Sequence, residues 1–181
     1  MTPLHGRNSS GGGRQSVKRA GGYRPIAAGM LRALYGLASA YWFLRRPKTH
    51  GAYVAVWVGD TLLCLQNTYR REITVPSGGI RAGEPPLAAA VRELWEEVGI
   101  SMAPGRLSFA GGFTRAHEFK EDTGFFFDIR LPVRPSVRID RVEVAWADFI
   151  RPETIDSAVM SPLLAAYLTV GRRPDQASVG A

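Results

Sequence analysis

The sequence contains very little cysteine, which limits the classes of protein it can belong to. Its single cysteine among 181 residues, Cys64, excludes an intramolecular disulfide and fits a reducing compartment. Cys64 lies in the apolar run TLLCL, where we expect a packed core thiol and not a nucleophile. Stability must therefore come from a hydrophobic core. A hydrophobic content of 45% at this length is enough for one domain with an extension.

Acidic residues are also missing from the first part of the chain. Residues 1–50 contain nine Lys and Arg and no Asp or Glu, whereas the remaining 131 residues contain 14 basic and 16 acidic residues. The formal net charge of +7 therefore describes the N-terminal extension and not the rest of the chain. Because the rest is slightly acidic, we do not expect a nucleic acid as its main partner.

The N-terminal extension divides into a tail and an apolar segment. Residues 1–25 are rich in Gly, Ser and Arg without a periodic apolar pattern, which predicts a disordered basic tail. Residues 26–47 are apolar, with a helix expected over 30–46 that ends before Pro47. Four interpretations stay open: packing on its own domain or in a homodimer, a peripheral membrane helix, a transmembrane span, or a cleaved targeting segment. We expect a cytoplasmic protein, with membrane association through 26–47 as one alternative.

The remaining elements predict one folded domain over residues 51–170 and a frayed tail over 171–181. Strands and helices alternate irregularly, which favours a mixed sheet between helices. The polar segment 113–122 is expected to be a mobile loop. The expected strands are 51–58, 61–66, 73–75, 106–112, 123–131 and 142–146, and the expected C-terminal helix is 157–170.

The stretch from Gly78 to Ile100 organises the chain and reads as a loop running into a short helix. Pro85 and Pro86 suit a first helical turn, and Gly99 suits a helix end. Apolar residues at helical spacing predict a face on the core, and three glutamates at i, i+3 and i+4 share the opposite face. The apolar residues are Leu87, Val91, Leu94, Trp95 and Val98, and the glutamates are Glu93, Glu96 and Glu97.

Three carboxylates within one helical turn repel one another unless a cation lies among them. Hard divalent cations such as Mg²⁺ and Mn²⁺ prefer oxygen ligands of this kind. Arg92 can pair with Glu96 at i+4, and Glu84 lies at the approach to the helix. The residues by themselves therefore predict a metal site on this helix.

The same residues resemble the signature of the Nudix hydrolases, G-x5-E-x7-R-E-U-x-E-E-x-G-U, where U is aliphatic. The resemblance implies a Nudix-type α/β/α sandwich with a mixed sheet. It also implies a pyrophosphohydrolase that uses Mg²⁺ or Mn²⁺ to cleave a nucleoside diphosphate linked to another moiety, by water attack on phosphorus. Every fixed position is filled, by Gly78, Glu84, Arg92, Glu93, Leu94, Glu96, Glu97, Gly99 and Ile100.

The resemblance also implies roles for single residues. Glu93, Glu96 and Glu97 are the expected metal ligands, and Glu84 adds a contact through water. Arg92 is expected to orient Glu93 and Glu96, while Gly78 and Gly79 let the backbone approach the metal and phosphates. The base that activates water stays open between Glu93 and three acids of the polar segment, Glu118, Glu121 and Asp122. Substrate phosphates are expected to pair with Arg70, Arg71 and Arg115.

The second moiety of the substrate is not indicated. The proline of ADP-ribose hydrolases and the tyrosine of diadenosine polyphosphate hydrolases have no counterpart near residues 115–118, which read RAHE. A small nucleoside diphosphate derivative is the expected substrate. Two other classes compete: a nucleotide-binding sensor without catalysis, which would usually lose the glutamates, and a hydrolase of RNA ends, suggested by the basic extension.

Overall fold

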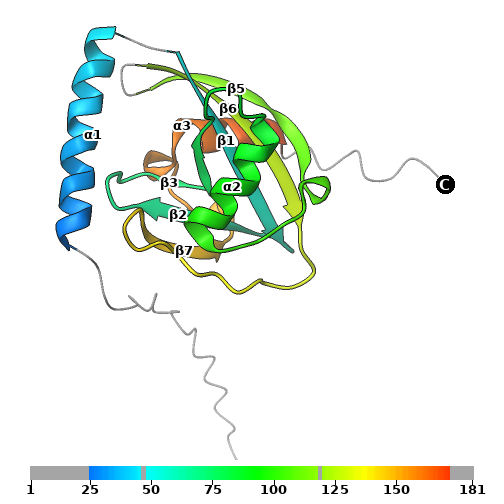
Figure 1. The fold of residues 1–181 in the computed structure, drawn as a ribbon. Helices are drawn as coiled ribbons and strands as arrows, with labels where there is room; N and C mark the ends of the chain where they lie inside the picture. The colour runs from blue at the N-terminus through cyan, green and yellow to red at the C-terminus, as the bar shows by residue number, and fades with distance from the viewer. Residues whose placement is uncertain (1–24, 46–47, 118–119, 172–181) are drawn as a thin grey trace, which may run out of the picture.

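The structure is a computed structural model that describes residues 25–45, 48–117 and 120–171. The predicted tails, apart from residues 25 and 171, and the candidate base Glu118 lie outside these ranges. The helices are α1 (Pro25–Arg45), α2 (Pro86–Val98) and α3 (Pro162–Gly171) (Figure 1). The strands are β1 (Lys48–Val58), β2 (Thr61–Asn67), β3 (Ile73–Thr74), β4 (Ser77–Gly79), β5 (Ser108–His117), β6 (Lys120–Arg130) and β7 (Val144–Ile150), with three short 3-10 turns at Pro104–Arg106, Pro152–Thr154 and Ser157–Val159.

Strand β1 lies at the centre of a mixed sheet with the order β3-β2-β1-β6-β5. It pairs parallel with β6 along ten residues, and antiparallel with β4 and then β2 on its other edge. Strand β7 adds an antiparallel pairing with β2. The predicted mixed sheet is confirmed.

Side chains of β1 alternate between two hydrophobic cores. Val54 and Val56 pack in a cluster that includes Leu94 of α2, whereas Ala55 and Trp57 pack in a cluster that includes Leu164 of α3. Helices therefore cover both faces of the sheet, with α2 in front of it and α3 behind in Figure 1. The predicted α/β/α sandwich is confirmed. It also explains why β1 reads as a continuous apolar run, since both of its faces are buried.

Helix α2 begins and ends where the sequence predicted. Pro85 is its N-cap, and Gly99 closes it in the left-handed conformation with φ of 69°. Leu94 and Val98 are fully buried, but the predicted core position of Trp95 is wrong, since that residue is 51% exposed. Successive helical residues are about 100° apart, so Trp95 lies beyond the narrow face that contacts the sheet.

Helix α1 lies beside the sandwich and is not part of either layer (Figure 1). It begins five residues before the predicted start at residue 30, because Pro25 is compatible with a first helical turn. It ends at Arg45, two residues before Pro47, which disfavours helix in the residue preceding it. Within the described ranges no helix, α1 included, is long and apolar enough to cross a membrane.

The predicted loop over 113–122 is wrong for most of its length. Strand β5 continues to His117 and β6 resumes at Lys120, so both flanks of this segment are paired strands. Polar side chains do not prevent pairing here, because the two strands extend past the core and bond to each other. The hydroxyls of Thr114 and Thr123, for example, are 2.9 Å apart across the pair.

Other predicted boundaries differ as well, including that of β1, which begins at Lys48 and not at Gly51. Strand β5 begins at Ser108 because residues 104–106 form a 3-10 turn, and β7 runs from 144 to 150, beyond the predicted 142–146. Helix α3 begins at Pro162 and not at Ser157, because the hydroxyl of Ser161 accepts a hydrogen bond from the Leu164 amide at 3.3 Å.

Truncation of Leu94 tests whether α2 is held by the core. We expect Leu94→Ala to lower the free energy of unfolding by about 2–4 kcal/mol, because it empties a fully buried position. Chemical denaturation of both proteins measures the difference. Val133→Ala, at a residue that is 70% exposed, is the control and should change stability by less than about 0.5 kcal/mol. Equal effects of the two substitutions would contradict the burial of this face.

Candidate active site

Helix α2 carries its three glutamates at the border between core and solvent. Glu93 is 8% exposed and Glu97 only 2% exposed, whereas the Glu96 side chain is 45% exposed. The prediction that all three share an outward face is therefore correct only for Glu96. Glu93 and Glu97 lie one turn apart, each beside a core residue, so burial and charge meet on the same face of the helix.

Glu97 is held by two hydrogen-bond donors. The side-chain amide of Asn67 donates to one carboxylate oxygen at 3.1 Å, and the backbone N–H of Ser77 donates to the other at 2.8 Å. Burial nevertheless raises the pKa of Glu97 to about 8, and the nearby Glu93 and Glu143 add to the rise. Asn67 was not predicted as a site residue. Ser77 contributes through its backbone N–H, which any residue except proline would supply at this position of β4.

The guanidinium of Arg92 holds the other carboxylates together. It donates to both oxygens of Glu84 at 2.8 and 2.9 Å, to Glu96 at 3.0 Å, and also to Glu93. A further bond joins it to the carbonyl oxygen of Gly79 at 3.0 Å. The hydrogen bonds from Arg92 help to lower the pKa of Glu84 to about 2 and raise the pKa of Arg92. Arg92 thus fixes three glutamates and the preceding turn in one arrangement.

Gly78 is required because the Glu93 carboxylate lies against it. A Cβ atom at Gly78 would be 2.1 Å from the carboxyl carbon of Glu93, closer than any real contact. At Gly79 a Cβ atom would meet nothing within 4 Å. The first glycine therefore makes room for a carboxylate, and the second supplies a carbonyl oxygen.

A segment after β6 adds an acidic residue that sequence reasoning missed. Residues 131–143 pass the C-terminal end of α2, where the amides of Arg138 and Asp140 donate to the carbonyls of Val98 and Glu97 at 2.9 and 3.1 Å. Glu143 follows and acts electrostatically on both Glu93 and Glu97. Burial, Asp140 and Glu96 raise the pKa of Glu143. The only signal in the sequence was an acidic pair, Asp140 and Glu143, at the start of a predicted strand.

A cleft of about 500 Å³ opens beside these carboxylates. Of the predicted substrate-binding residues, Gly78, Gly79 and Arg70 line it, whereas Arg71 and Arg115 are exposed and lie outside its lining. The structure therefore brings together only part of the predicted set. The cleft is lined by Lys48, Thr49, His50, Gly51, Tyr53, Asn67, Tyr69, Arg70, Ser77, Gly78, Gly79, Ile80 and Asp122.

The predicted bases on β6 stand apart from the glutamates of α2. Glu121 pairs with Lys48 at 3.3 Å, and Asp122 accepts a hydrogen bond from Thr49 at 2.8 Å. Lys48 precedes by three residues Gly51, the β1 residue paired with Gly79. That offset corresponds to about 10 Å along the strand. Asp122 lines the far end of the cleft, and Glu121 faces solvent.

Arg70 connects the cleft to α1. Its Nε donates to the hydroxyl of Tyr35 at 3.0 Å, and its guanidinium lies 5.2 Å from the centre of the Tyr35 ring and 5.7 Å from that of Tyr69. The two tyrosine rings lie 5.0 Å apart. On the same helix, Arg32 donates to the carbonyl of Thr68 at 3.0 Å. Helix α1 therefore supports the turn that carries Arg70.

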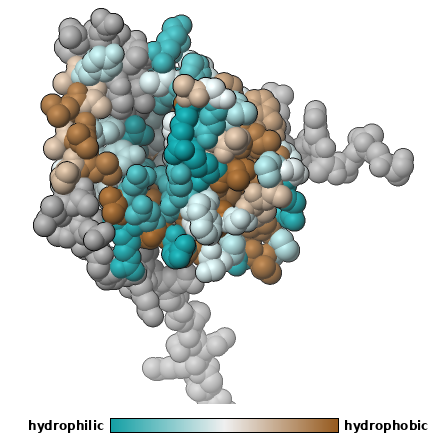
Figure 2. Space-filling view, viewed as in Figure 1, coloured by the Kyte–Doolittle hydropathy of each residue, from teal (hydrophilic) through white to brown (hydrophobic). Residues whose placement is uncertain are grey.

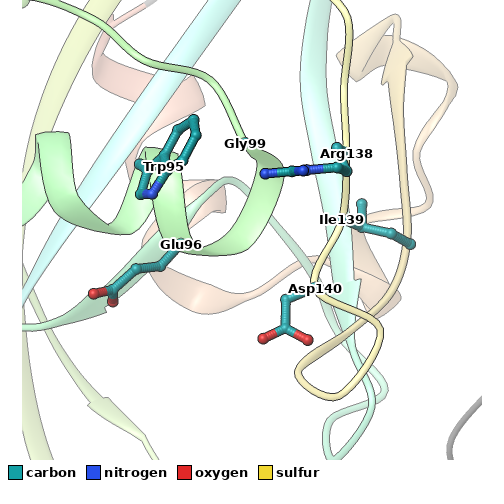
Figure 3. Close-up of a pocket in the computed structure, with 6 residues that line it drawn as sticks. All are labelled: Trp95, Glu96, Gly99, Arg138, Ile139 and Asp140. Carbon is teal, nitrogen blue, oxygen red and sulfur yellow. The ribbon is translucent and has the colours of Figure 1, made fainter.

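A second hollow, of about 250 Å³, lies at the C-terminal end of α2 and is drawn in Figure 3. Trp95, Glu96 and Gly99 line it from α2, facing Arg138, Ile139 and Asp140 of the passing segment. The Arg138 guanidinium lies 5.8 Å from the Trp95 ring centre. This hollow shares Glu96 with the carboxylate cluster but none of the residues that line the cleft.

The donor set fits a hard divalent cation. No three Asp, Glu, His or Cys side chains converge as metal ligands within residues 25–45, 48–117 and 120–171. The glutamates instead accept hydrogen bonds from Arg92, Asn67 and Ser77. All the charged acceptors are nevertheless oxygens, the ligands that Mg²⁺ and Mn²⁺ prefer. Glu97 is buried with a strongly raised pKa, so a bound cation would stabilise its ionised form.

Comparison with known proteins agrees with this fold. A family model described as the NUDIX domain matches residues 45–166. Among solved structures, a MutT NUDIX hydrolase from Burkholderia pseudomallei is 14% identical, with a TM-score of 0.60 over 68% of this chain and 97% of that one. A MutT protein from Methanosarcina mazei Go1 is 19% identical, with a TM-score of 0.58 over 71% of this chain and 93% of that one.

A third solved structure belongs to a larger protein. The bifunctional NMN adenylyltransferase/ADP ribose pyrophosphatase of Francisella tularensis, complexed with AMP and a manganese ion, is 16% identical with a TM-score of 0.60. The similarity covers 77% of this chain and 46% of that one. No curated protein sequence matches the chain. At these identities the solved structures show a shared fold.

The raised pKa of Glu97 predicts how stability depends on pH in chelator-treated protein. Between its ordinary value of 4.5 and about 8, this carboxyl is protonated in the folded state and ionised in the unfolded state. Folding then takes up a proton, so the free energy of unfolding should fall as the pH rises through this window. Denaturation at several pH values measures the slope. Glu97→Gln should reduce the slope, and an unchanged slope would contradict the assignment.

Proposed function

The chain belongs to the Nudix hydrolase family, and from this we propose that it hydrolyses the diphosphate bond of a nucleoside diphosphate derivative with Mg²⁺ or Mn²⁺. The observation that carries the proposal is Glu97. It is a 2% exposed carboxylate, held by Asn67 and Ser77 at the edge of an open cleft. Burial of a carboxylate lowers the stability of the fold, so a buried carboxylate at the edge of a cleft indicates a function. A nucleotide sensor without catalysis would not need this one.

The residues of the cluster have two kinds of role. Some are ligands of the cation, and the others position those ligands. Glu93, Glu96 and Glu97 are the proposed ligands, and Arg92 positions two of them together with Glu84. When bound, the cation neutralises diphosphate charge and lowers the pKa of water. Glu84 is fully engaged by Arg92 and the Arg81 amide, so its contribution is to fix Arg92.

We assign the base to Glu143 in place of the acids on β6. It is exposed to solvent and acts electrostatically on both Glu93 and Glu97, and burial, Asp140 and Glu96 raise its pKa, which strengthens it as a proton acceptor. The water oxygen attacks one phosphorus, the bond from that phosphorus to the bridging oxygen breaks, and the bridging oxygen leaves on the other phosphate. Glu143 retains the proton of the water until it is released to solvent.

The cleft sets the class of substrate. Its basic residues, Lys48 and Arg70, suit the charge of a diphosphate, and Tyr69 lies beside Arg70. The solved structures with a similar fold include an ADP ribose pyrophosphatase and a dihydroneopterin triphosphate pyrophosphohydrolase, the latter at a TM-score of 0.50. A small nucleotide derivative is therefore the proposed substrate, and the cytoplasmic location stays a prediction.

A phosphate-release screen tests the proposed activity. Purified full-length protein with Mg²⁺ or Mn²⁺ should act on one class among nucleoside triphosphates, nucleotide sugars, ADP-ribose, dinucleoside polyphosphates and capped RNA. Glu97→Gln should abolish turnover with the fold retained, because it removes a ligand charge without opening a cavity. If the folded protein released phosphate from none of these substrates, a nucleotide-binding sensor without catalysis would be favoured. A preference for capped RNA would favour a hydrolase of RNA ends.

The base assignment has its own test. We expect Glu143→Gln to lower kcat by about 10²–10⁴-fold with KM little changed, the usual loss when a general base is removed. Glu121→Gln is the matched control, because that carboxylate faces solvent and pairs with Lys48. Steady-state kinetics of both variants give the comparison. A larger loss in the Glu121 variant would restore the base to β6.

Arg70 is expected to bind the substrate phosphates. Arg70→Ala should raise KM about tenfold or more, because a charge-assisted hydrogen bond is lost, while kcat should change little. Tyr35→Phe removes the hydroxyl that accepts from Arg70 but keeps the ring, so a smaller rise in KM is expected. Arg71→Ala is the control, at an exposed residue outside the cleft lining. An effect of the control equal to that of Arg70→Ala would refute this role.

A further inference from the structure

Helix α1 has two different faces. The residues facing the sandwich include Arg32 and Tyr35, which bond to the turn at 68–70. On the outer face four large apolar side chains are exposed: Met30 at 64%, Leu34 at 59%, Leu37 at 70% and Tyr41 at 55%. These four residues are here called the outer stripe. Figure 2 shows hydrophobic side chains along α1, at the left edge of the view.

The outer stripe is continuous along the helix. Its members are spaced by four, three and four residues, so they fall within a sector of about 60° on the helix surface. From Met30 to Tyr41 the stripe is about 17 Å long at the helical rise of 1.5 Å per residue. An apolar strip of this shape on the outside of a domain marks an interaction surface, since scattered exposed residues would not align.

The charge around the stripe indicates what it binds. Helix α1 contains no Asp or Glu, and residues 1–50 together contain nine Lys and Arg without a single acid. Lys48, three residues after the end of the helix, has a side chain that is 77% exposed and pairs with Glu121 at 3.3 Å. An apolar stripe in a part of the sequence that has basic residues and no acids favours a partner that is apolar and anionic. A bilayer containing anionic lipids has both properties.

We propose that α1 binds the surface of an anionic lipid bilayer, with the outer stripe in the interfacial region and the basic residues at the headgroups. The helix would lie flat on the bilayer, with its inner face still bonded to residues 68–70. A second copy of the chain is a poorer occupant, because two acid-free basic helices repel each other when their stripes meet. A nucleic acid would leave the aliphatic side chains without an apolar partner.

Sedimentation with vesicles tests this proposal on the full chain. Vesicles of phosphatidylcholine with 30% phosphatidylglycerol are compared with phosphatidylcholine alone, at low and high salt. We expect binding to the mixed vesicles, at least about tenfold weaker binding to the neutral ones, and weakening with salt. Equal binding to both vesicle types, or binding to neither, would overturn the proposal.

A matched pair of variants separates the outer stripe from the basic residues. Leu34→Gln with Leu37→Gln removes apolar surface at residues that are 59% and 70% exposed, without adding charge. Val170→Gln with Val133→Gln does the same at 59% and 70% exposure on the sandwich. The first pair should weaken vesicle binding by about tenfold or more, and the second should leave it unchanged. Binding retained by both pairs would overturn the role of the stripe.

Two further measurements decide between the lipid surface and the other occupants. The mass of the full chain in lipid-free buffer, from light scattering, is expected to be that of a monomer. A dimer that dissociates in the Leu34→Gln/Leu37→Gln variant would assign the stripe to a second copy. Single-stranded RNA that displaces the protein from vesicles, and whose binding is lost in the same variant, would assign the stripe to nucleic acid. Either result would overturn the proposal.

Discussion

The carboxylates of α2 are buried where the helix meets the sheet, and much of the surrounding structure compensates for that burial. Two like charges one turn apart, at 8% and 2% exposure, would destabilise the fold if they were left alone. Arg92 pairs with one of them, and Asn67 and the Ser77 amide bond to the other. Gly78 leaves room for the carboxylate of Glu93. The fixed residues of the signature are thus mutually dependent, since each one makes the position of another tolerable.

The fold was largely predictable because its signals are local. The continuous apolar run of β1, the prolines and glycine that bound α2, and the irregular alternation of elements all indicate a sandwich that the structure confirms. The largest error has its cause in tertiary pairing. The segment 113–122 forms strands because its two flanks pair with each other, and no property of either flank alone shows that.

Only the part of the candidate site that lies within one continuous segment of the chain was predictable from the sequence. The residues from Gly78 to Ile100 showed which side chains share a helix, but not how deeply the sheet buries Glu93 and Glu97. Asn67 and Glu143 reach the cluster from β2 and from the segment before β7, 30 residues before and 46 residues after Glu97 in the chain. Only the packing of the segment 131–143 against the end of α2 brings Glu143 there. Among the arginines, charge alone did not distinguish Arg70, which lines the cleft, from Arg71, which faces solvent.

The hydrogen bond between Tyr35 and Arg70 joins two regions that are far apart in the sequence. Under the role proposed for Arg70, the hydroxyl of Tyr35 orients the guanidinium through Nε and leaves its terminal N–H groups for the substrate phosphates. Any ligand of α1 that strengthens or weakens this bond therefore changes the affinity of the cleft, and the cleft changes the affinity of α1 by the same factor. The coupling free energy is bounded by the strength of that single contact, on the order of 1–3 kcal/mol. Under the roles proposed for Arg70 and α1, binding at the helix and binding in the cleft would therefore change each other's affinity by a modest and equal factor.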